Sequence, residues 1–381
     1  MRETNLPYGR HLIDDADIAA VDAVLRSDWL TGGPNVGAFE QAVASYCGAT
    51  HGIAVCNGTA ALHCAMQALG VSPGDEVIVS PMTFCASANV VLYQGGTPVF
   101  ADIAPGTLLL DPQAVERCIT QKTKGIIAVD YAGQPCDYSA LRTVASRHGL
   151  FLVADACHAL GGRWQDRAVG SLADITCLSF HPVKHITTGE GGMALTEDAD
   201  LAERMRRMRN HGIDTDPMRR AKQGTWRYEM VSLGHNYRIT DIQCALGLSQ
   251  LTKLPQWLRH RTHLAACYTA ALRTLPGITP LELAPDATHA WHLYVVRVNK
   301  ERTPGRDAVF QALRKRRILA NVHYIPVYRH PYYQQHFHDC LPQCPVCEAA
   351  FEEILSLPMH AGMTEADVAS VVDALREGVP A

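Results

Sequence analysis

The sequence predicts an α/β protein whose mainly parallel sheet is covered by helices on both faces. Between about residues 51 and 196, short apolar runs of strand length alternate with helix-like segments, as in parallel strands joined by crossover helices. The 381 residues are 47% apolar and 19% charged, which is typical of a folded globular chain. The strand-like runs are HGIAVC (51–56), EVIVS (76–80), TPVFAD (97–102), GIIAVD (125–130), LFLVADA (150–156), ITCLSF (175–180) and GGMALT (191–196).

Length and charge narrow the class of ligand. At about 150 residues per domain, the chain should form two or three domains. It carries 34 Lys and Arg against 38 Asp and Glu, a net charge of −4, so neither a nucleic acid nor an anionic membrane is expected as a partner. We expect small-molecule ligands.

The 13 cysteines predict reduced thiols rather than a disulfide framework. Their number is odd, and they are scattered from Cys47 to Cys347 in a long chain. The first 15 residues are rich in charge and have no secretory pattern, and no later run approaches the ~20 apolar residues of a membrane helix. We therefore expect a cytoplasmic protein.

Several residues of the first domain predict where helices begin and end. A helix is predicted to begin at Asn57-Gly58-Thr59, directly after a strand, and to end near Gly70. Residues 197–212 are typical of a charged helix with a solvated face, and residues 214–224 of a basic loop containing Pro and Gly.

A second domain is predicted to begin at Pro255. A helix over 241–254 precedes this proline, which should open a new helix. We therefore divide the chain into residues 1–254, an N-terminal segment with the large domain, and residues 255–381, a smaller α+β domain. The expected elements of the smaller domain are strands over 292–298 and 320–327 and helices over 307–317 and 364–377.

The segment SFHPVKHITTGEGG, residues 179–192, is the most informative in the sequence. Most lysines are solvated surface charges. Lys184, however, follows an apolar strand and precedes a glycine-rich return to another strand, which should place it beside the ligand crevice of the sheet. A partly desolvated amine there would have a lowered pKa and could react with the carbonyl of a ligand.

A carboxylate and a helix start complete a possible pyridoxal phosphate (PLP) site. Asp155 directly follows apolar strand residues, and a helix cap is an equally good interpretation of this position. PLP enzymes combine a lysine that holds the aldehyde with an acid beside the pyridine nitrogen. Gly58 and Thr59 offer N–H groups and a hydroxyl to a phosphate at a helix start.

Six segments, read in order, resemble the nucleotide-sugar aminotransferases of the DegT/DnrJ/EryC1/StrS family. The resemblance runs from about Tyr8 to about Leu375, nearly the whole chain. The segments are NGTAAL (57–62), PMTFCASAN (81–89), DACHALGG (155–162), SFHPVKHITTGEGG (179–192), GHNYRITDIQCALGLSQL (234–251) and VHYIPVY (322–328).

This resemblance implies the PLP-dependent aspartate-aminotransferase fold, type I. The family has a large domain with a mainly parallel seven-stranded sheet, a smaller C-terminal α+β domain, and a homodimer with active sites shared between the subunits. It implies that Lys184 holds PLP, Asp155 contacts the pyridine nitrogen and Phe84 stacks on the ring. The other implied cofactor contacts are Gly58, Thr59 and Ser179 at the phosphate, Asn236 reaching the phosphate from the neighbouring subunit, and His158 at the phenolic oxygen, where many relatives have glutamine.

The family also suggests residues that face the sugar nucleotide. An N-terminal segment and a C-terminal strand line that site in relatives, although packing is an equally good interpretation of aromatic residues there. Arg238 is a candidate partner for a carboxylate or a diphosphate, because its planar guanidinium suits either. The remaining candidates are Tyr8, Trp29, Thr31, His323 and Tyr324.

The segments HPVKHITTGEGG and DYAG (130–133) resemble one branch of the family in particular. That branch aminates C4 of a UDP-linked 4-keto-6-deoxy-N-acetylhexosamine in pseudaminic acid biosynthesis. L-Glutamate would supply the amino group, 2-oxoglutarate would be released, and the kinetics would be ping-pong. The alternative within the family is another nucleotide-linked 4-keto sugar, such as a UDP-4-keto-pentose or a dTDP- or GDP-4-keto-6-deoxyhexose.

Other interpretations are less favoured. PLP-dependent sugar dehydratases of the same fold carry histidine in place of the lysine, so Lys184 argues against them. A non-catalytic protein that retains the fold stays open. Cys344 and Cys347 form a C-x2-C pair near His336, His338 and Cys340, but one such pair is too few for a structural zinc site, and we expect no metal.

Overall fold

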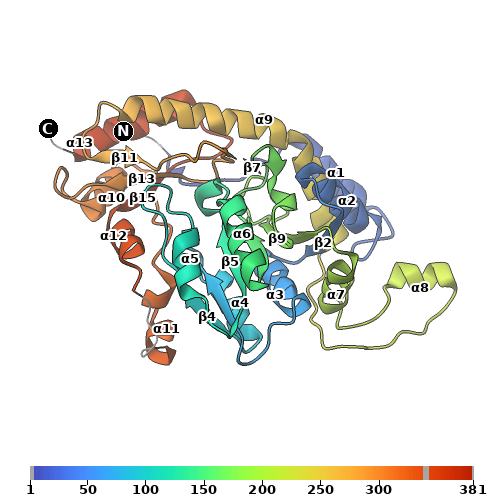
Figure 1. The fold of residues 1–381 in the computed structure, drawn as a ribbon. Helices are drawn as coiled ribbons and strands as arrows, with labels where there is room; N and C mark the ends of the chain where they lie inside the picture. Colours follow the sequence, from blue (N-terminus) through green and yellow to red (C-terminus); the bar gives the residue numbers. More distant parts are fainter. Residues whose placement is uncertain (1–3, 338–342, 380–381) are drawn as a thin grey trace.

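The computed structural model describes residues 4–337 and 343–379, and its central element is a seven-stranded sheet (Figure 1). The strand order is β2-β10-β9-β6-β5-β3-β4. β10 is antiparallel to both of its neighbours, and the other pairs are parallel. The strands are β2 (His51–Val55), β3 (Glu76–Val79), β4 (Thr97–Phe100), β5 (Thr123–Val129), β6 (Phe151–Asp155), β9 (Ile175–Ser179) and β10 (Gly192–Thr196). The seven predicted strands and the mainly parallel sheet are confirmed.

The helices of the large domain follow the signals in the sequence. The Asn57 side chain accepts a hydrogen bond from the Ala60 N–H at 2.8 Å, so the helix after β2 is capped where predicted. The chain leaves this helix through Gly70, whose positive φ of 74° favours glycine. The helices are α1 (Asp15–Leu25), α2 (Pro34–Cys47), α3 (Gly58–Ala68), α4 (Ala86–Tyr93), α5 (Pro112–Cys118), α6 (Tyr138–His148) and α7 (Ala199–Arg209).

The C-terminal part builds a second, smaller sheet. Its antiparallel strands have the order β11-β13-β15, with bounds β11 (Ile278–Pro280), β13 (Tyr294–Val298) and β15 (Ile354–Leu357). Its helices are α10 (Arg306–Lys315), α11 (Pro331–His336), α12 (Pro345–Glu353) and α13 (Glu365–Gly378). The short strands are β1 (Leu6–Pro7) beside β14 (Ile318–Leu319), and β12 (Ala287–Thr288), β7 (Arg163–Trp164) and β8 (Arg167–Ala168) in a third sheet.

The two helices predicted around Pro255 are one helix, α9 (Asp241–Leu272), which runs along one edge of the molecule (Figure 1). Pro255 lies inside it and supplies no N–H to the preceding turn. The helix continues because both halves bury apolar side chains, Leu254 in the core of the large sheet and Leu264 in the core of the small one. The division into residues 1–254 and 255–381 falls within α9 and stays a prediction.

Two other expectations about secondary structure were wrong. The predicted loop over 214–224 contains a short helix, α8 (Pro217–Gln223), because Asp216 caps its start and Gly224, at φ 66°, ends it. The predicted strand over 320–327 is not a regular strand. After a single bridge between Asn321 and Ser356, this segment leaves the small sheet and crosses to the large domain, where the Val327 N–H donates to the Pro81 carbonyl.

Two further features concern the environment of the chain. No helix of the described residues has the length and apolar character that crossing a membrane requires. No disulfide links the cysteines of residues 4–337 and 343–379.

A buried carboxylate joins the N-terminal segment to α9. Asp17, on α1, is only 1% exposed and accepts hydrogen bonds from three side chains of α9. These donors are Ser249 Oγ at 2.6 Å, Gln250 Nε2 at 2.6 Å and Lys253 Nζ at 2.7 Å. The N-terminal segment is thereby held against the helix that spans both cores.

Asp17→Ala should destabilise the protein by about 3 kcal/mol, because it leaves the side chains of Ser249 and Gln250 without their acceptor and removes one of the two carboxylates that pair with Lys253. Urea unfolding followed by circular dichroism measures the change. Asp22→Ala is the matched control, since Asp22 pairs with Arg26 on the exposed side of the same helix. Equal loss in both variants would contradict the role of burial.

Candidate active site

The ends of neighbouring parallel strands bring the sequence-predicted residues together. Asp155 is the last residue of β6, and Ser179 is the last residue of its parallel neighbour β9. Gly58 begins α3, and a Cβ built on it would lie 3.0 Å from Ser179 Cβ and 3.1 Å from Cys157 Sγ. A larger residue here would require Ser179 or Cys157 to shift by a few tenths of an ångström, so glycine suits the close approach of α3 to the end of β9. Thr59 follows as a half-buried residue of the same helical turn.

The Asp155 carboxylate is held by hydrogen bonds from two directions. The Ser87 hydroxyl on α4 donates to Oδ2 at 2.5 Å, and the Cys157 N–H donates to Oδ1 at 3.3 Å. Ser87 in turn shares a hydrogen bond of 2.7 Å with the Thr83 hydroxyl. The carboxylate is 7% exposed, so these contacts fix its orientation at the end of the strand.

Lys184 lies in the turn that follows β9, where its N–H donates to the His181 carbonyl at 2.8 Å. Burial lowers the pKa of the Lys184 ammonium, and the nearby Cys157 and Asp155 raise it by a smaller amount. The structure therefore places the amine and the Asp155 carboxylate within electrostatic reach of each other. A lysine with a lowered pKa is suited to accept and return a proton.

Uncharged histidines surround Lys184. Burial lowers the pKa of His158, His185 and His292 well below the usual value, and the charge of Lys184 lowers each further. Within the described residues, the Nδ1 atoms of these three rings are buried without a hydrogen-bond partner. The rings of His158 and His292 lie 4.4 Å apart between centroids. These histidines can offer hydrogen bonds to a ligand without adding positive charge.

Residues of the segment 320–327 contact the histidines around Lys184 from the side of the small domain. The Tyr324 hydroxyl and His158 Nε2 are 3.0 Å apart, and the Tyr324 ring centroid is 6.1 Å from that of Phe84. His323 packs on the Tyr8 ring at 5.0 Å between centroids, and burial with the nearby Lys184 lowers its pKa to about 4. Phe84 itself is 58% exposed.

Four other predicted residues lie in a second group. The arm that carries α8 stands away from the body of the molecule (Figure 1), and Asn210, which lines a cavity beside α8, pairs with Asn236 in an isolated bridge. Thr31 forms an isolated bridge with Thr240, and Arg238 donates to Asn210 Oδ1 at 2.8 Å. Arg238 also lines a cavity of about 940 Å³ between α2, α7 and α8. The four residues are Trp29, Thr31, Asn236 and Arg238.

The residues on either side of Asn236 pack against each other and α3, and the Asn236 side chain is exposed. The rings of His235 and Tyr237 stack at 4.8 Å between centroids, and the Tyr237 hydroxyl meets His63 Nδ1 of α3 at 3.0 Å. Asn236 lies between these two residues and is exposed, as is Arg238. Within the described chain both residues contact Asn210, Asn236 through an isolated bridge and Arg238 through its side chain, rather than Lys184 or Asp155.

The first group fits PLP. It combines an amine of lowered pKa, a carboxylate held by hydrogen bonds, a helix start beside Ser179, and the unpartnered Nδ1 of His158. These four groups suit, in turn, the aldehyde, pyridine nitrogen, phosphate and phenolic oxygen of the cofactor. Fold and site together define the class of PLP-dependent enzymes with the aspartate-aminotransferase fold.

Comparisons with known proteins identify the family. The model of the DegT/DnrJ/EryC1/StrS aminotransferase family matches residues 11–376. The spore coat polysaccharide biosynthesis protein SpsC of Bacillus subtilis is 40% identical over 375 residues, which are 98% of this chain and 96% of that protein. Helicobacter pylori PseC, an aminotransferase involved in the biosynthesis of pseudoaminic acid, has a TM-score of 0.93 and 33% identity, covering 99% of both chains.

A third comparison bears on the cofactor. Spr1654 from Streptococcus pneumoniae, described as a sugar aminotransferase, was solved in its PLP form and has a TM-score of 0.90, 31% identity and 98% coverage of both chains. The chain belongs to the DegT/DnrJ/EryC1/StrS aminotransferase family. It is a PLP-dependent nucleotide-sugar aminotransferase, as the resemblance in its sequence predicts.

Some residues of this site were missed in the sequence. Ser87 lies in the segment PMTFCASAN, three residues after Phe84, but its contact with Asp155 spans 68 positions of the chain. His292 stands at the start of a predicted strand and had no signal of its own. Tyr131, in DYAG, donates its hydroxyl proton to the His323 carbonyl, a contact that no local pattern indicates.

We expect no metal at the histidines and cysteines near the C-terminus, and the structure describes only some of them. His338 and Cys340 lie outside the described residues. Cys344 and Cys347 are buried in the core, whereas His336 is exposed and contacts the Tyr332 carbonyl through Nδ1 at 2.8 Å.

Asp130 is a second buried carboxylate next to the site. It accepts hydrogen bonds from the Cys136 N–H and the Tyr138 hydroxyl, both at 2.9 Å, and its Oδ2 has no partner. Burial raises the pKa of Asp130 to about 7, and the nearby Asp155 acts in the same direction. The folded protein therefore binds this proton more tightly than the unfolded chain.

The Asp130 contribution to stability should consequently fall as the pH rises from about 4, the pKa of an unfolded aspartate, to about 7, and then level off. Between pH 5 and pH 7 the wild type should lose about 2 kcal/mol relative to Asp130→Asn, which has no such ionisation. Urea unfolding of both proteins across this range, at fixed protein and PLP concentrations, measures the difference. Parallel pH profiles would contradict the assignment.

Proposed function

We propose that this protein transfers the amino group of L-glutamate to C4 of a UDP-linked 4-keto-6-deoxy-N-acetylhexosamine in pseudaminic acid biosynthesis. The observation that carries the proposal is the match to PseC along 99% of both chains, together with the lysine, carboxylate and histidines gathered at one strand edge. A cytoplasmic location belongs to the same proposal. An aminotransferase for another nucleotide-linked 4-keto sugar is the alternative.

In this proposal Lys184 holds the cofactor and then moves the proton. PLP, when bound, accepts the electrons left behind as the amino acid loses its α-proton. The lowered pKa of Lys184 lets its amine take that proton and return it at the neighbouring carbon. Asp155, oriented by Ser87, keeps the pyridine nitrogen protonated.

The remaining cofactor contacts follow the geometry of the strand ends. The N–H groups that begin α3, with the Thr59 and Ser179 hydroxyls, bind the phosphate beside Gly58. Phe84 would stack on the ring, and His158, whose Nε2 meets the Tyr324 hydroxyl, would donate to the phenolic oxygen. Because His158 is neutral, it does not add a second positive charge next to Lys184.

Substrate contacts come from both groups of residues. His323 lies near Lys184 and packs against Tyr8 and Tyr324, and we propose that these three residues line the sugar side of the site. Trp29, Thr31 and Arg238 face outward with Asn236, so we propose that a second copy of the chain completes each site. Large apolar side chains on the arm, Trp226 at 81% and Leu233 at 84% exposed, support a homodimer.

The substrate is tested by offering the holoenzyme L-glutamate with several UDP-, dTDP- and GDP-linked 4-ketohexoses and a UDP-4-keto-pentose. The UDP-linked N-acetylhexosamine should be aminated at C4 with the highest kcat/KM, as shown by NMR of the product and by release of 2-oxoglutarate. A clear preference for another keto sugar would replace this proposal by the alternative. No transamination of any of them would reject both.

Lys184→Ala should lower the transamination rate by about a thousandfold or more, because the variant lacks the group that moves the proton. It should also lose the yellow colour that borohydride bleaches in the wild type. Lys122→Ala removes an exposed lysine and serves as the matched control. Full activity in Lys184→Ala would exclude this lysine from the reaction.

Sharing of the site between subunits is tested by mixing two inactive variants. If Asn236 acts on the neighbouring subunit, a dimer of one Lys184→Ala and one Asn236→Ala chain contains one intact site. After unfolding and refolding together, the mixture should regain about a quarter of the wild-type activity, since about half of the dimers are mixed. Activity no higher than that of the separate variants would place Asn236 in the site of its own chain.

A further inference from the structure

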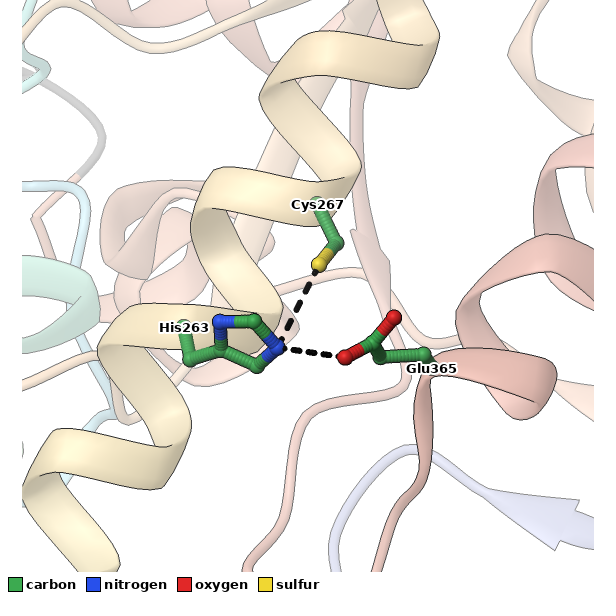
Figure 2. Close-up of side chains that lie close together, drawn as sticks. All are labelled: His263, Cys267 and Glu365. Atoms are coloured by element: carbon green, nitrogen blue, oxygen red, sulfur yellow. Dashed lines mark hydrogen bonds and ion pairs between the residues drawn. The ribbon is translucent and has the colours of Figure 1, made fainter.

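A nitrogen, a sulfur and an oxygen donor converge at the junction of α9 and α13 (Figure 2). His263 and Cys267 are four residues apart on α9 and lie on the same face of the helix. Glu365, the first residue of α13, reaches toward them. One donor atom from each residue lies within 4.8 Å of the other two.

We infer that His263, Cys267 and Glu365 form a zinc site that joins the two helices. Zn²⁺ accepts imidazole nitrogen, thiolate sulfur and carboxylate oxygen together, and a water molecule completes the tetrahedron when a protein supplies three ligands. Binding displaces the thiol proton of Cys267, which is released to solvent. Nothing in the aminotransferase reaction requires this site.

The distances fit a tetrahedral ion after a small rearrangement. With zinc–nitrogen and zinc–sulfur bonds of about 2.0 and 2.3 Å, two tetrahedral ligands stand about 3.6 Å apart. His263 Nε2 and Cys267 Sγ are 3.8 Å apart. His263 Nε2 and Glu365 Oε1 are 2.7 Å apart as an ion pair, so the carboxylate must withdraw by less than about 1 Å. The Glu365 side chain is 71% exposed and free of core packing, so it can make this movement.

The pair formed by His148 of α6 and Glu116 of α5 is a comparison that lacks the sulfur. His148 Nε2 and Glu116 Oε1 form an exposed ion pair at 2.8 Å, almost the geometry of the His263–Glu365 pair. The described residues contain one group of three metal-ligand side chains close enough together to bind a single ion. This group is His263, Cys267 and Glu365. The thiol at the i+4 position therefore distinguishes this site from an ordinary surface pair.

Zinc binding is tested on the chelator-treated, PLP-loaded protein by isothermal titration with Zn²⁺ and by visible spectra with Co²⁺. We expect one equivalent of bound zinc, a tetrahedral cobalt spectrum with thiolate charge transfer after subtraction of the metal-free holoenzyme, and a higher Tm with zinc. Cys267→Ser should abolish the charge-transfer band. His263→Gln and Glu365→Gln should each weaken zinc binding by about tenfold or more.

The controls separate this site from non-specific binding. His148→Gln breaks the comparison ion pair, and Cys118→Ser removes another half-buried helical thiol, so both should bind zinc like the wild type. All variants should keep PLP absorbance and circular dichroism, which shows that they fold. Absence of zinc binding to the wild type, or zinc affinity unchanged by Cys267→Ser, would overturn the proposal.

Discussion

The unfavourable desolvation of one ammonium group is the constraint on which the rest of the site depends. Lys184 lies where burial opposes its charge, and Asp155, at the end of the adjoining strand, offsets that effect only in part. Two strands running in the same direction must end at the same edge, so the sheet brings the acid and the amine together. An antiparallel neighbour would place their strand ends on opposite edges.

The surroundings of Lys184 are polar yet carry little charge. Four histidines from different parts of the chain lie near it: His158, His185, His292 and His323. Burial lowers the pKa of each ring, so each is neutral near neutral pH. A charged imidazolium in any of these positions would repel the ammonium form and compete for the Asp155 carboxylate. The cluster therefore supplies hydrogen bonds to a ligand while leaving the charge balance to one amine and one acid.

The small domain takes part in the site because one segment leaves its sheet. Residues 320–327 cross from the bridge at Asn321 to the Pro81 carbonyl, and this route presents His323 and Tyr324 to Lys184. Arg261 of α9, almost fully buried, stabilises the junction by donating to the Trp291 and Met359 carbonyls at 3.0 Å.

The sequence by itself determined the sheet, the start of α3 and the lysine–acid pair. Strands buried on both faces must be continuous apolar runs, and Asn57 caps its helix through a contact only three residues long. Motifs at strand ends marked Lys184 and Asp155 for the same local reason. Of these predictions, the sheet and the start of α3 are confirmed.

Only the tertiary structure decided the features that depend on residues far apart in the chain. Pro255 suggests a helix end, yet burial in two different cores carries α9 through it. Apolar alternation suggests a strand over 320–327, yet contacts with the large domain remove the segment from its sheet. Ser87, Tyr131 and His292 joined the site across long separations, because packing brings such partners together while local propensity acts over a few residues.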